Sequence, residues 1–115
     1  MNSLRNQVQL LGNLGKDVEL KTLQSGSIKA SFTLATDESY KDSKGKKVEN
    51  TQWHNVIAWG KSAELMKSIL SKGSKVLVRG KILNRSYDDK DGVKKYITEI
   101  QANEFVCMDT KEMPF

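Results

Sequence analysis

Thr51-Gln-Trp-His-Asn-Val-Ile-Ala-Trp59 predicts a β-strand that is apolar on both sides. Side chains alternate along a strand, which places Trp53, Asn55, Ile57 and Trp59 on one side and Val56 and Ala58 on the other. Either both sides are buried, or one side is an aromatic platform for a flat ligand. The basic composition of the chain favours the platform.

The same two-residue period predicts further strands along the chain. They are expected over residues 4–11 (continued at 18–23), 28–35, 75–87 and 93–100. Gly80 predicts a bulge at which the fourth long strand bends. Asp88-Asp-Lys-Asp-Gly92 is typical of a hairpin turn, and the lysine-rich residues 37–50 are expected to form a mobile basic finger.

One segment has a helical period. Leu65 and Ile69, and likewise Met66 and Leu70, are four residues apart, which predicts a helix over residues 61–70 with one apolar face. Three strands, one short helix and two strands is the element order of the OB-fold, a five-stranded Greek-key barrel. We therefore expect an all-β domain over residues 1–107, followed by a short tail over residues 108–115.

Length and charge narrow the class of protein. The 115 residues suffice for one domain, and 19 Lys and Arg against 14 Asp and Glu give a net charge of +5, which favours a polyanionic partner. No apolar run reaches the roughly 18 residues of a membrane span, and the N-terminus does not resemble a signal peptide. The single cysteine, Cys107, fits a reducing cytosol.

Residues for catalysis are few. The chain has one His and one Cys, far apart in sequence, and its acidic turn with Asp88, Asp89 and Asp91 is interrupted by lysine. Neither common phosphate-binding glycine loop occurs. We expect no enzymatic activity, no metal site and no cofactor.

The fourth long strand favours nucleic-acid binding. Its predicted core side carries Val76, Val78, Gly80 and Ile82, and its predicted outer side carries Lys75, Leu77, Arg79, Lys81, Leu83, Arg85 and Tyr87. Cations and flat rings together suit single-stranded nucleic acid, whose phosphates recur and whose base faces are free for stacking. Tyr40 lies in a polar stretch where a core role is less natural, whereas Tyr96 is ambiguous.

Several motifs together resemble the bacterial single-stranded DNA-binding protein (SSB) family along nearly the whole chain. They are Val8-Gln-Leu-Leu-Gly-Asn-Leu-Gly-Lys-Asp17, Phe32-Thr-Leu-Ala-Thr36, Thr51-Gln-Trp-His-Asn-Val56, Trp59-Gly-Lys-Ser-Ala-Glu64, Leu70-Ser-Lys-Gly-Ser74, Gly80-Lys-Ile and Tyr96-Ile-Thr-Glu99. The combination is highly specific.

The resemblance implies a homotetramer of OB-folds around which single-stranded DNA wraps. The stacking positions of the family fall on Tyr40, Trp53, Trp59 and Tyr87. Subunit contacts fall on Asn6, Val8, Leu10 and His54. The predicted phosphate contacts, from the finger and the fourth long strand, are Lys41, Lys46, Lys47, Arg79, Lys81 and Arg85.

The end of the chain departs from the family pattern. The long flexible linker of the family is missing, and the acidic tip is reduced to Asp109 and Glu112 around Lys111. The last residues still match the tip that recruits replication and repair proteins, so partner docking is expected at Glu112, Met113, Pro114 and Phe115. The alternative is a vestigial terminus.

The sequence therefore predicts a cytoplasmic, nucleoid-associated protein that binds single-stranded DNA without strong sequence preference in replication, recombination and repair. An RNA-binding or primosome-type accessory protein on the same fold is one alternative. A protein-interaction adaptor is another, in which Trp53 and Trp59 are buried between subunits.

Overall fold

The computed structural model describes residues 3–108. A 3-10 helix, η1 (Ser3–Arg5), precedes eight strands and one α-helix. The elements are β1 (Val8–Leu14), β2 (Glu19–Thr22), β3 (Ile28–Asp37), β4 (Tyr40–Lys41), β5 (Lys47–Val48), β6 (Thr51–Trp59), α1 (Gly60–Ile69), β7 (Lys75–Asp88) and β8 (Lys94–Cys107). The first strand therefore begins four residues later than predicted and runs through Gly12.

Five of the strands close into a barrel. The sheet order is β1-β7-β8-β6-β3-β2, and an additional pairing of β1 with β3 joins its two sides. Only the β6–β8 pairing is parallel among the strands described. With α1 between β6 and β7, this arrangement confirms the predicted OB-fold.

Alternation along the strands builds the core. Ala30, Phe32 and Leu34 of β3 are buried with Val56 of β6, as the two-residue period predicts. Helix α1 adds Met66, which is fully buried. The predicted single apolar face of this helix was wrong, because Leu65 and Ile69 are exposed.

The predicted irregularity at Gly80 is confirmed, and the extra residue lies on the neighbouring strand. Arg79 pairs with Glu104 and Gly80 pairs with Ala102, so Asn103 of β8 is the bulged residue. Beyond this point β7 pairs only with β8 and leaves the barrel. Ile82, predicted to be core, is therefore exposed.

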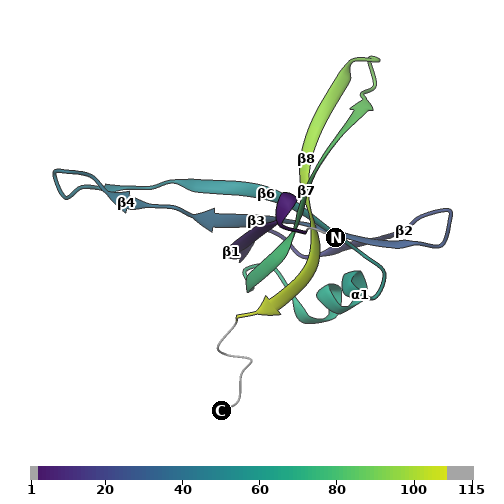
Figure 1. Ribbon diagram of the computed structural model, residues 1–115, viewed down its shortest axis with the longest axis horizontal. Helices are drawn as coiled ribbons and strands as arrows, with labels where there is room; N and C mark the ends of the chain where they lie inside the picture. Colours follow the sequence, from purple (N-terminus) through teal and green to yellow (C-terminus); the bar gives the residue numbers. More distant parts are fainter. Residues whose placement is uncertain (1–2, 109–115) are drawn as a thin grey trace, which may run out of the picture.

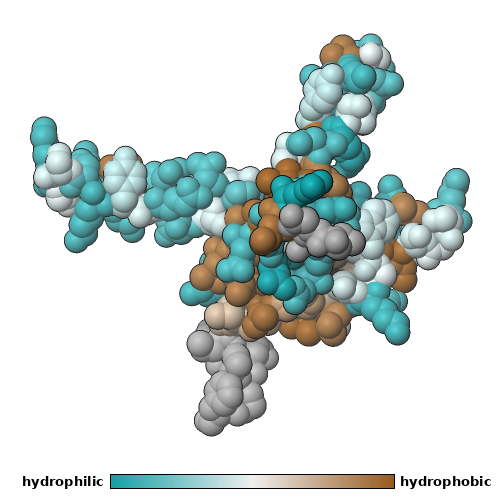
Figure 2. Space-filling model, in the orientation of Figure 1, coloured by the Kyte–Doolittle hydropathy of each residue, from teal (hydrophilic) through white to brown (hydrophobic). Residues whose placement is uncertain are grey.

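Three hairpins project from the barrel (Figure 1). They are the β2–β3 hairpin, the extension of β3 and β6 over residues 37–51 (the finger), and residues 84–98 of β7 and β8, beyond the last pairing with β6 (the arm). The radius of gyration of 16.4 Å exceeds the roughly 13 Å of a compact chain of this length because of these projections. Figure 2 shows that the arm and finger are largely hydrophilic.

The finger is more regular than the predicted loop. Tyr40 pairs with Val48 and Lys41 with Lys47, which makes it a hairpin. The Asp42 carboxylate closes the turn by accepting hydrogen bonds from the amides of Lys44 and Lys46, both at 2.9 Å. Within residues 3–108, no helix is long and apolar enough to cross a membrane.

Candidate nucleic-acid interface

The outward side of β3 and β6 carries the tryptophans. We call this surface the tryptophan face; it comprises Lys29, Ser31, Thr33 and Ala35 of β3 and Trp53, Asn55, Ile57 and Trp59 of β6, which pair in register. The side chain of Ile57 is buried, but Trp53 is 62% exposed and Trp59 is 39% exposed. Of the two initial interpretations, the exposed platform is therefore the one that the monomer adopts.

Trp53 is held against the backbone of Gly15. The Gly15 amide donates a hydrogen bond to the Thr33 carbonyl at 2.9 Å. A Cβ atom added to Gly15 would lie 2.5 Å from Cζ3 of Trp53 and 2.7 Å from Oγ1 of Thr33. A side chain at position 15 would have to displace the indole ring or the Thr33 hydroxyl, so the ring packs directly on Gly15 while most of it stays exposed.

Trp59 is flanked by a cation. The Nζ atom of Lys29 lies 5.7 Å from the centroid of the Trp59 ring, within the range of a cation–π interaction. Lys29 was not among the phosphate contacts predicted from the sequence. Its position opposite Trp59 in the β3–β6 register would have indicated it.

The arm continues the tryptophan face. Asn55 of β6 pairs with Glu99 of β8, and Glu99 pairs with Leu83 of β7. Because paired residues share a side and alternate residues repeat it, Tyr87 points to the same side as Trp53. The structure thus brings Tyr87 to the side of the sheet that carries both tryptophans.

Tyr40 lies farther along, on the finger. Its ring is exposed, and Tyr40 and Lys41 point to opposite sides of the finger because they are consecutive strand residues. Lys41, Lys46 and Lys47 are also exposed on this hairpin. The finger therefore offers one ring and several cations at one end of the tryptophan face.

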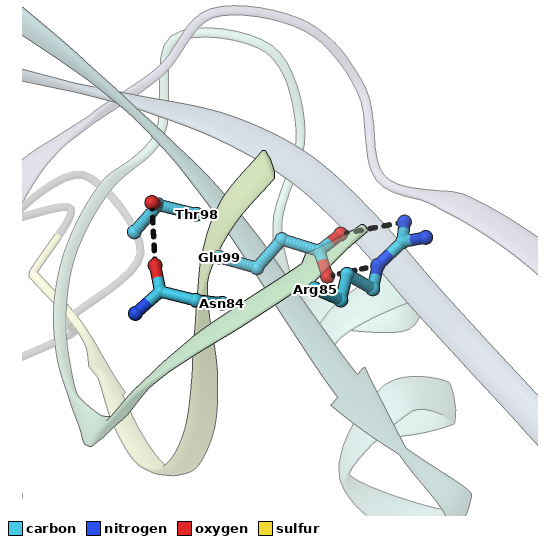
Figure 3. Close-up of polar contacts among 4 residues, drawn as sticks. All are labelled: Asn84, Arg85, Thr98 and Glu99. Carbon is cyan, nitrogen blue, oxygen red and sulfur yellow. Dashed lines mark hydrogen bonds and ion pairs between the residues drawn. The ribbon is translucent and has the colours of Figure 1, made fainter. Parts of the chain in front are cut away.

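An ion pair lies where the arm joins the face. The Arg85 guanidinium donates hydrogen bonds from Nε to Oε1 of Glu99 at 2.7 Å and from a terminal nitrogen to Oε2 at 3.3 Å (Figure 3). On the opposite side of the arm, Oγ1 of Thr98 donates to Oδ1 of Asn84 at 2.7 Å. Arg85 is thus directed by Glu99, which the sequence shows only as part of the motif Tyr96-Ile-Thr-Glu99 and not as a predicted site residue.

Glu99 is charged although it is only 5% exposed. The hydrogen bond from Arg85 lowers the pKa of the Glu99 carboxyl below its ordinary value, against the opposing effect of burial. The same hydrogen bond raises the pKa of Arg85. Much of the positive charge of Arg85 is therefore balanced before any phosphate approaches.

The depressed pKa of Glu99 predicts a pH-dependent stability. The pair contributes to the free energy of unfolding above about pH 4.3, the ordinary pKa of glutamate, and its contribution is lost as the pH falls through the lower folded value. Urea denaturation between about pH 3 and about pH 7 should show wild type losing its stability advantage over Glu99→Gln at the acid end. If the difference in the free energy of unfolding between wild type and Glu99→Gln were the same at every pH, the ion pair would not be its cause. Glu64→Gln, on the exposed surface of α1, serves as the control.

Arg79 lies apart from the tryptophan face. It forms an ion pair with Glu104 and lines a hollow with Gln9, Leu77 and Val106 on the outer side of β1, β7 and β8. Of the predicted phosphate contacts on β7, Lys81 lies at the base of the arm and Arg85 lies within it. The structure therefore does not bring Arg79 together with the two tryptophans.

Three of the four predicted subunit contacts lie on β1 or just before it, and the fourth, His54, lies on β6. The side-chain amide of Asn6 donates to the carbonyl of Ile82 and accepts from its amide, both at 3.0 Å, which extends the β1–β7 ladder within one chain. Val8 and Leu10 are half-buried against the core. His54 is half-buried, with Nε2 lying 3.0 Å from Oγ1 of Thr36. The predicted docking residues Glu112, Met113, Pro114 and Phe115 lie outside the described residues.

Comparison with known proteins agrees with this geometry. The model of the single-strand binding protein family matches residues 5–108. Single-stranded DNA-binding protein 1 of Chlorobaculum tepidum is 44% identical over 108 residues, covering 93% of this chain and 67% of the relative. The protein of the same name from Xylella fastidiosa is 39% identical over 108 residues, covering 93% of this chain and 79% of the relative.

A solved structure has the same fold. The Plasmodium falciparum SSB complex with ssDNA superposes with a TM-score of 0.79 at 30% sequence identity, covering 90% of this chain and 95% of that chain. The family match and these relatives lead to one conclusion. The chain belongs to the single-strand binding protein family.

Proposed function

We propose that this protein binds single-stranded DNA without strong sequence preference. The observation that carries the proposal is the exposure of Trp53 and Trp59 on one side of the sheet, with the Lys29 ammonium beside Trp59. Exposed rings stack on bases of any sequence, and the neighbouring cation meets the phosphate backbone. The ssDNA complex of the structural neighbour supports the same assignment.

The proposed contacts follow the face from finger to arm. Bases stack on Tyr40, Trp53, Trp59 and Tyr87, and phosphates contact Lys29, Lys41, Lys46, Lys47 and Lys81. Arg85 contributes through the guanidinium atoms that Glu99 leaves free. Single-stranded DNA would reach Arg79 only if it wrapped onto the β1 side of the barrel.

The proposed assembly is a homotetramer. Residues 8–13 of β1 pair with β7 along one edge, while β1 pairs with β3 only through Asn13 and Leu14. Among residues 3–108, the second edge of β1 before Asn13 therefore has no strand partner and could add one. Leu11 and Val106 are exposed on the adjoining outer side of the barrel. Asn6, Val8, Leu10 and His54 would then lie at or next to the subunit contact.

The cellular role proposed is to protect exposed strands in replication, recombination and repair, in the cytoplasm and on the nucleoid. Docking of replication and repair proteins is assigned to Glu112, Met113, Pro114 and Phe115, on the family resemblance of this tip. Removal of Phe115 should abolish partner binding and leave DNA binding intact.

Competition against labelled oligo-dT tests the proposed substrate. Unlabelled oligo-dT should displace the label at far lower concentration than either oligo-rU of equal length or duplex DNA, because a duplex hides its base faces. Equal or better displacement by oligo-rU would favour the RNA-binding alternative. Sedimentation of the free protein, and of its complex, should give the mass of four chains.

A further inference from the structure

The ladder of paired backbone groups breaks where the finger leaves the barrel (Figure 1). β3 pairs with β6 as far as Asp37 and Thr51, and β4 pairs with β5 from Tyr40 and Val48 as a separate two-stranded sheet. The register continues across the break, but the two residues between these pairs on each strand, all of them within the described range, form no ladder pair. A few residues at the ends of strands are the usual place for a hinge, so the finger can bend here relative to the barrel.

The Ser39 hydroxyl bridges this break. In a regular antiparallel ladder, Glu38 and Asn50 would exchange two backbone hydrogen bonds. The Glu38 amide does donate to the Asn50 carbonyl at 2.7 Å, but the Asn50 amide donates to Oγ of Ser39 at 3.2 Å. A side-chain hydroxyl thus replaces a backbone carbonyl as the acceptor and joins the two strands of the finger.

Asp37 fixes the direction of that hydroxyl. Oγ of Ser39 donates to Oδ1 of Asp37 at 2.5 Å, and the Ser39 amide donates to the same oxygen at 3.0 Å. These hydrogen bonds lower the pKa of the Asp37 carboxyl, so the acceptor is ionised at neutral pH and both bonds are charge-assisted. Because the hydroxyl proton is directed to Asp37, the lone pairs of Oγ are available to the Asn50 amide.

Thr36 supports the same junction from the other side of the sheet. Its Oγ1 donates to Oε2 of Glu38 at 3.1 Å and lies 3.0 Å from Nε2 of His54. Thr36 and Glu38 alternate with Asp37 and Ser39 along the chain, so the two sets of contacts lie on opposite sides of the break. Thr36 is buried whereas Ser39 is only half-buried, which makes Ser39 the position that can be changed without disturbing the core.

We propose that Ser39 is a positioning residue for DNA binding, whose hydroxyl holds Tyr40 in the orientation in which its ring stacks on a base. Tyr40 follows Ser39 directly, and its exposed ring belongs to the first pair beyond the break. Without the hydroxyl, the finger adopts other orientations, and the apparent affinity falls with the fraction of molecules that have Tyr40 in place. This inference rests on the proposed function and adds a residue that acts through Tyr40.

Binding of oligo-dT to the full chain, measured by fluorescence anisotropy, tests the role of the hydroxyl. Ser39→Ala should raise the Kd by between about twofold and about tenfold, the effect of one net hydrogen bond. Ser39→Thr keeps the hydroxyl and should bind like wild type. Ser68→Ala, which removes a serine hydroxyl from the exposed surface of α1, is the matched control. In the Tyr40→Ala background, Ser39→Ala should have little further effect, because the ring that it positions is gone.

Trypsin cleavage of the free protein supplies a readout that does not depend on DNA. Ser39→Ala should speed cleavage after Lys44 and Lys46 of the finger, and leave cleavage after Lys90 and Lys94 of the arm unchanged. An unchanged Kd or unchanged finger cleavage in Ser39→Ala, an equal loss of affinity in Ser39→Thr, or the same fold-change with and without Tyr40 would overturn the inference and leave the proposed function standing. Failure of the wild type to bind oligo-dT would overturn the proposed function and, with it, the inference.

Discussion

Replacing Trp53 with alanine should weaken oligo-dT binding by between about fivefold and about 150-fold, the loss of about 1–3 kcal/mol that a stacked base contributes. Trp53 is the more exposed of the two tryptophans, and its ring already packs on one side against Gly15. Little conformational freedom is then lost when a base stacks on it, so most of the stacking free energy appears as affinity. Fluorescence anisotropy at constant salt measures the change.

Two variants serve as controls for Trp53→Ala. Trp53→Phe keeps a flat ring and should retain much of the affinity. Tyr96→Ala removes a ring that is 77% exposed on the side of the arm away from Tyr87, and it should have little effect. If Trp53→Ala instead dissociated the oligomer and left DNA binding unchanged, the adaptor alternative would be correct.

Gly80→Ala should lower the free energy of unfolding by about 3 kcal/mol, the upper range for overpacking a well-filled interior. A Cβ atom at this position would collide with the carbonyl of Gln101, a backbone group that no side-chain rotation can move away. The collision falls where β7 leaves the barrel, between the register with β1 and the start of the arm. Urea denaturation followed by tryptophan fluorescence measures the loss.

Lys81→Ala is the matched control for Gly80→Ala. Lys81 is the next residue of β7, is exposed and pairs with Gln101, so its truncation should change stability only slightly. A stable Gly80→Ala variant would mean that β8 shifts readily at Asn103, and that the bulge does not hold the arm in its register.

The barrel was predicted well because the patterns that indicate it lie within short stretches of the sequence. Alternation in residues 28–35 and 51–59 reports directly which side of a strand is buried, and Phe32 and Val56 are core residues as expected. Gly80 likewise predicted the position of the irregularity in the β7–β8 pairing, although the extra residue lies on β8. These features depend on neighbours along the chain, which the sequence displays.

The errors arise where burial depends on distant elements. Leu65 and Ile69 satisfy a helical period as well as Met66 does, but only the position of α1 over β3 decides which of them are covered. Ile82 keeps the core parity of β7 after the strand has left the barrel. Apolar periodicity does not show where a strand leaves the core and its inward side chains become exposed to solvent.

The candidate site was predicted only in part, because the sequence shows which residues share a strand but not which residues other strands bring to the same face. The two tryptophans were found because they lie on one strand, whereas Lys29 and Glu99 reach the same face from β3 and β8. Glu99 in particular has the appearance of an ordinary surface residue in Tyr96-Ile-Thr-Glu99. Its role becomes visible only when the register places it beside Asn55 and Arg85.

Tryptophan fluorescence during titration with oligo-dT is the measurement that tests stacking on Trp53 and Trp59 most directly. Saturable quenching is predicted, with an affinity that falls as salt rises by a log–log slope of about 0.7 for each phosphate contacted. Repeating the titration with Trp53→Ala and Trp59→Ala should assign the quenching to each ring. Fluorescence that stays unchanged when oligo-dT is added, or an affinity indifferent to salt, would contradict the account.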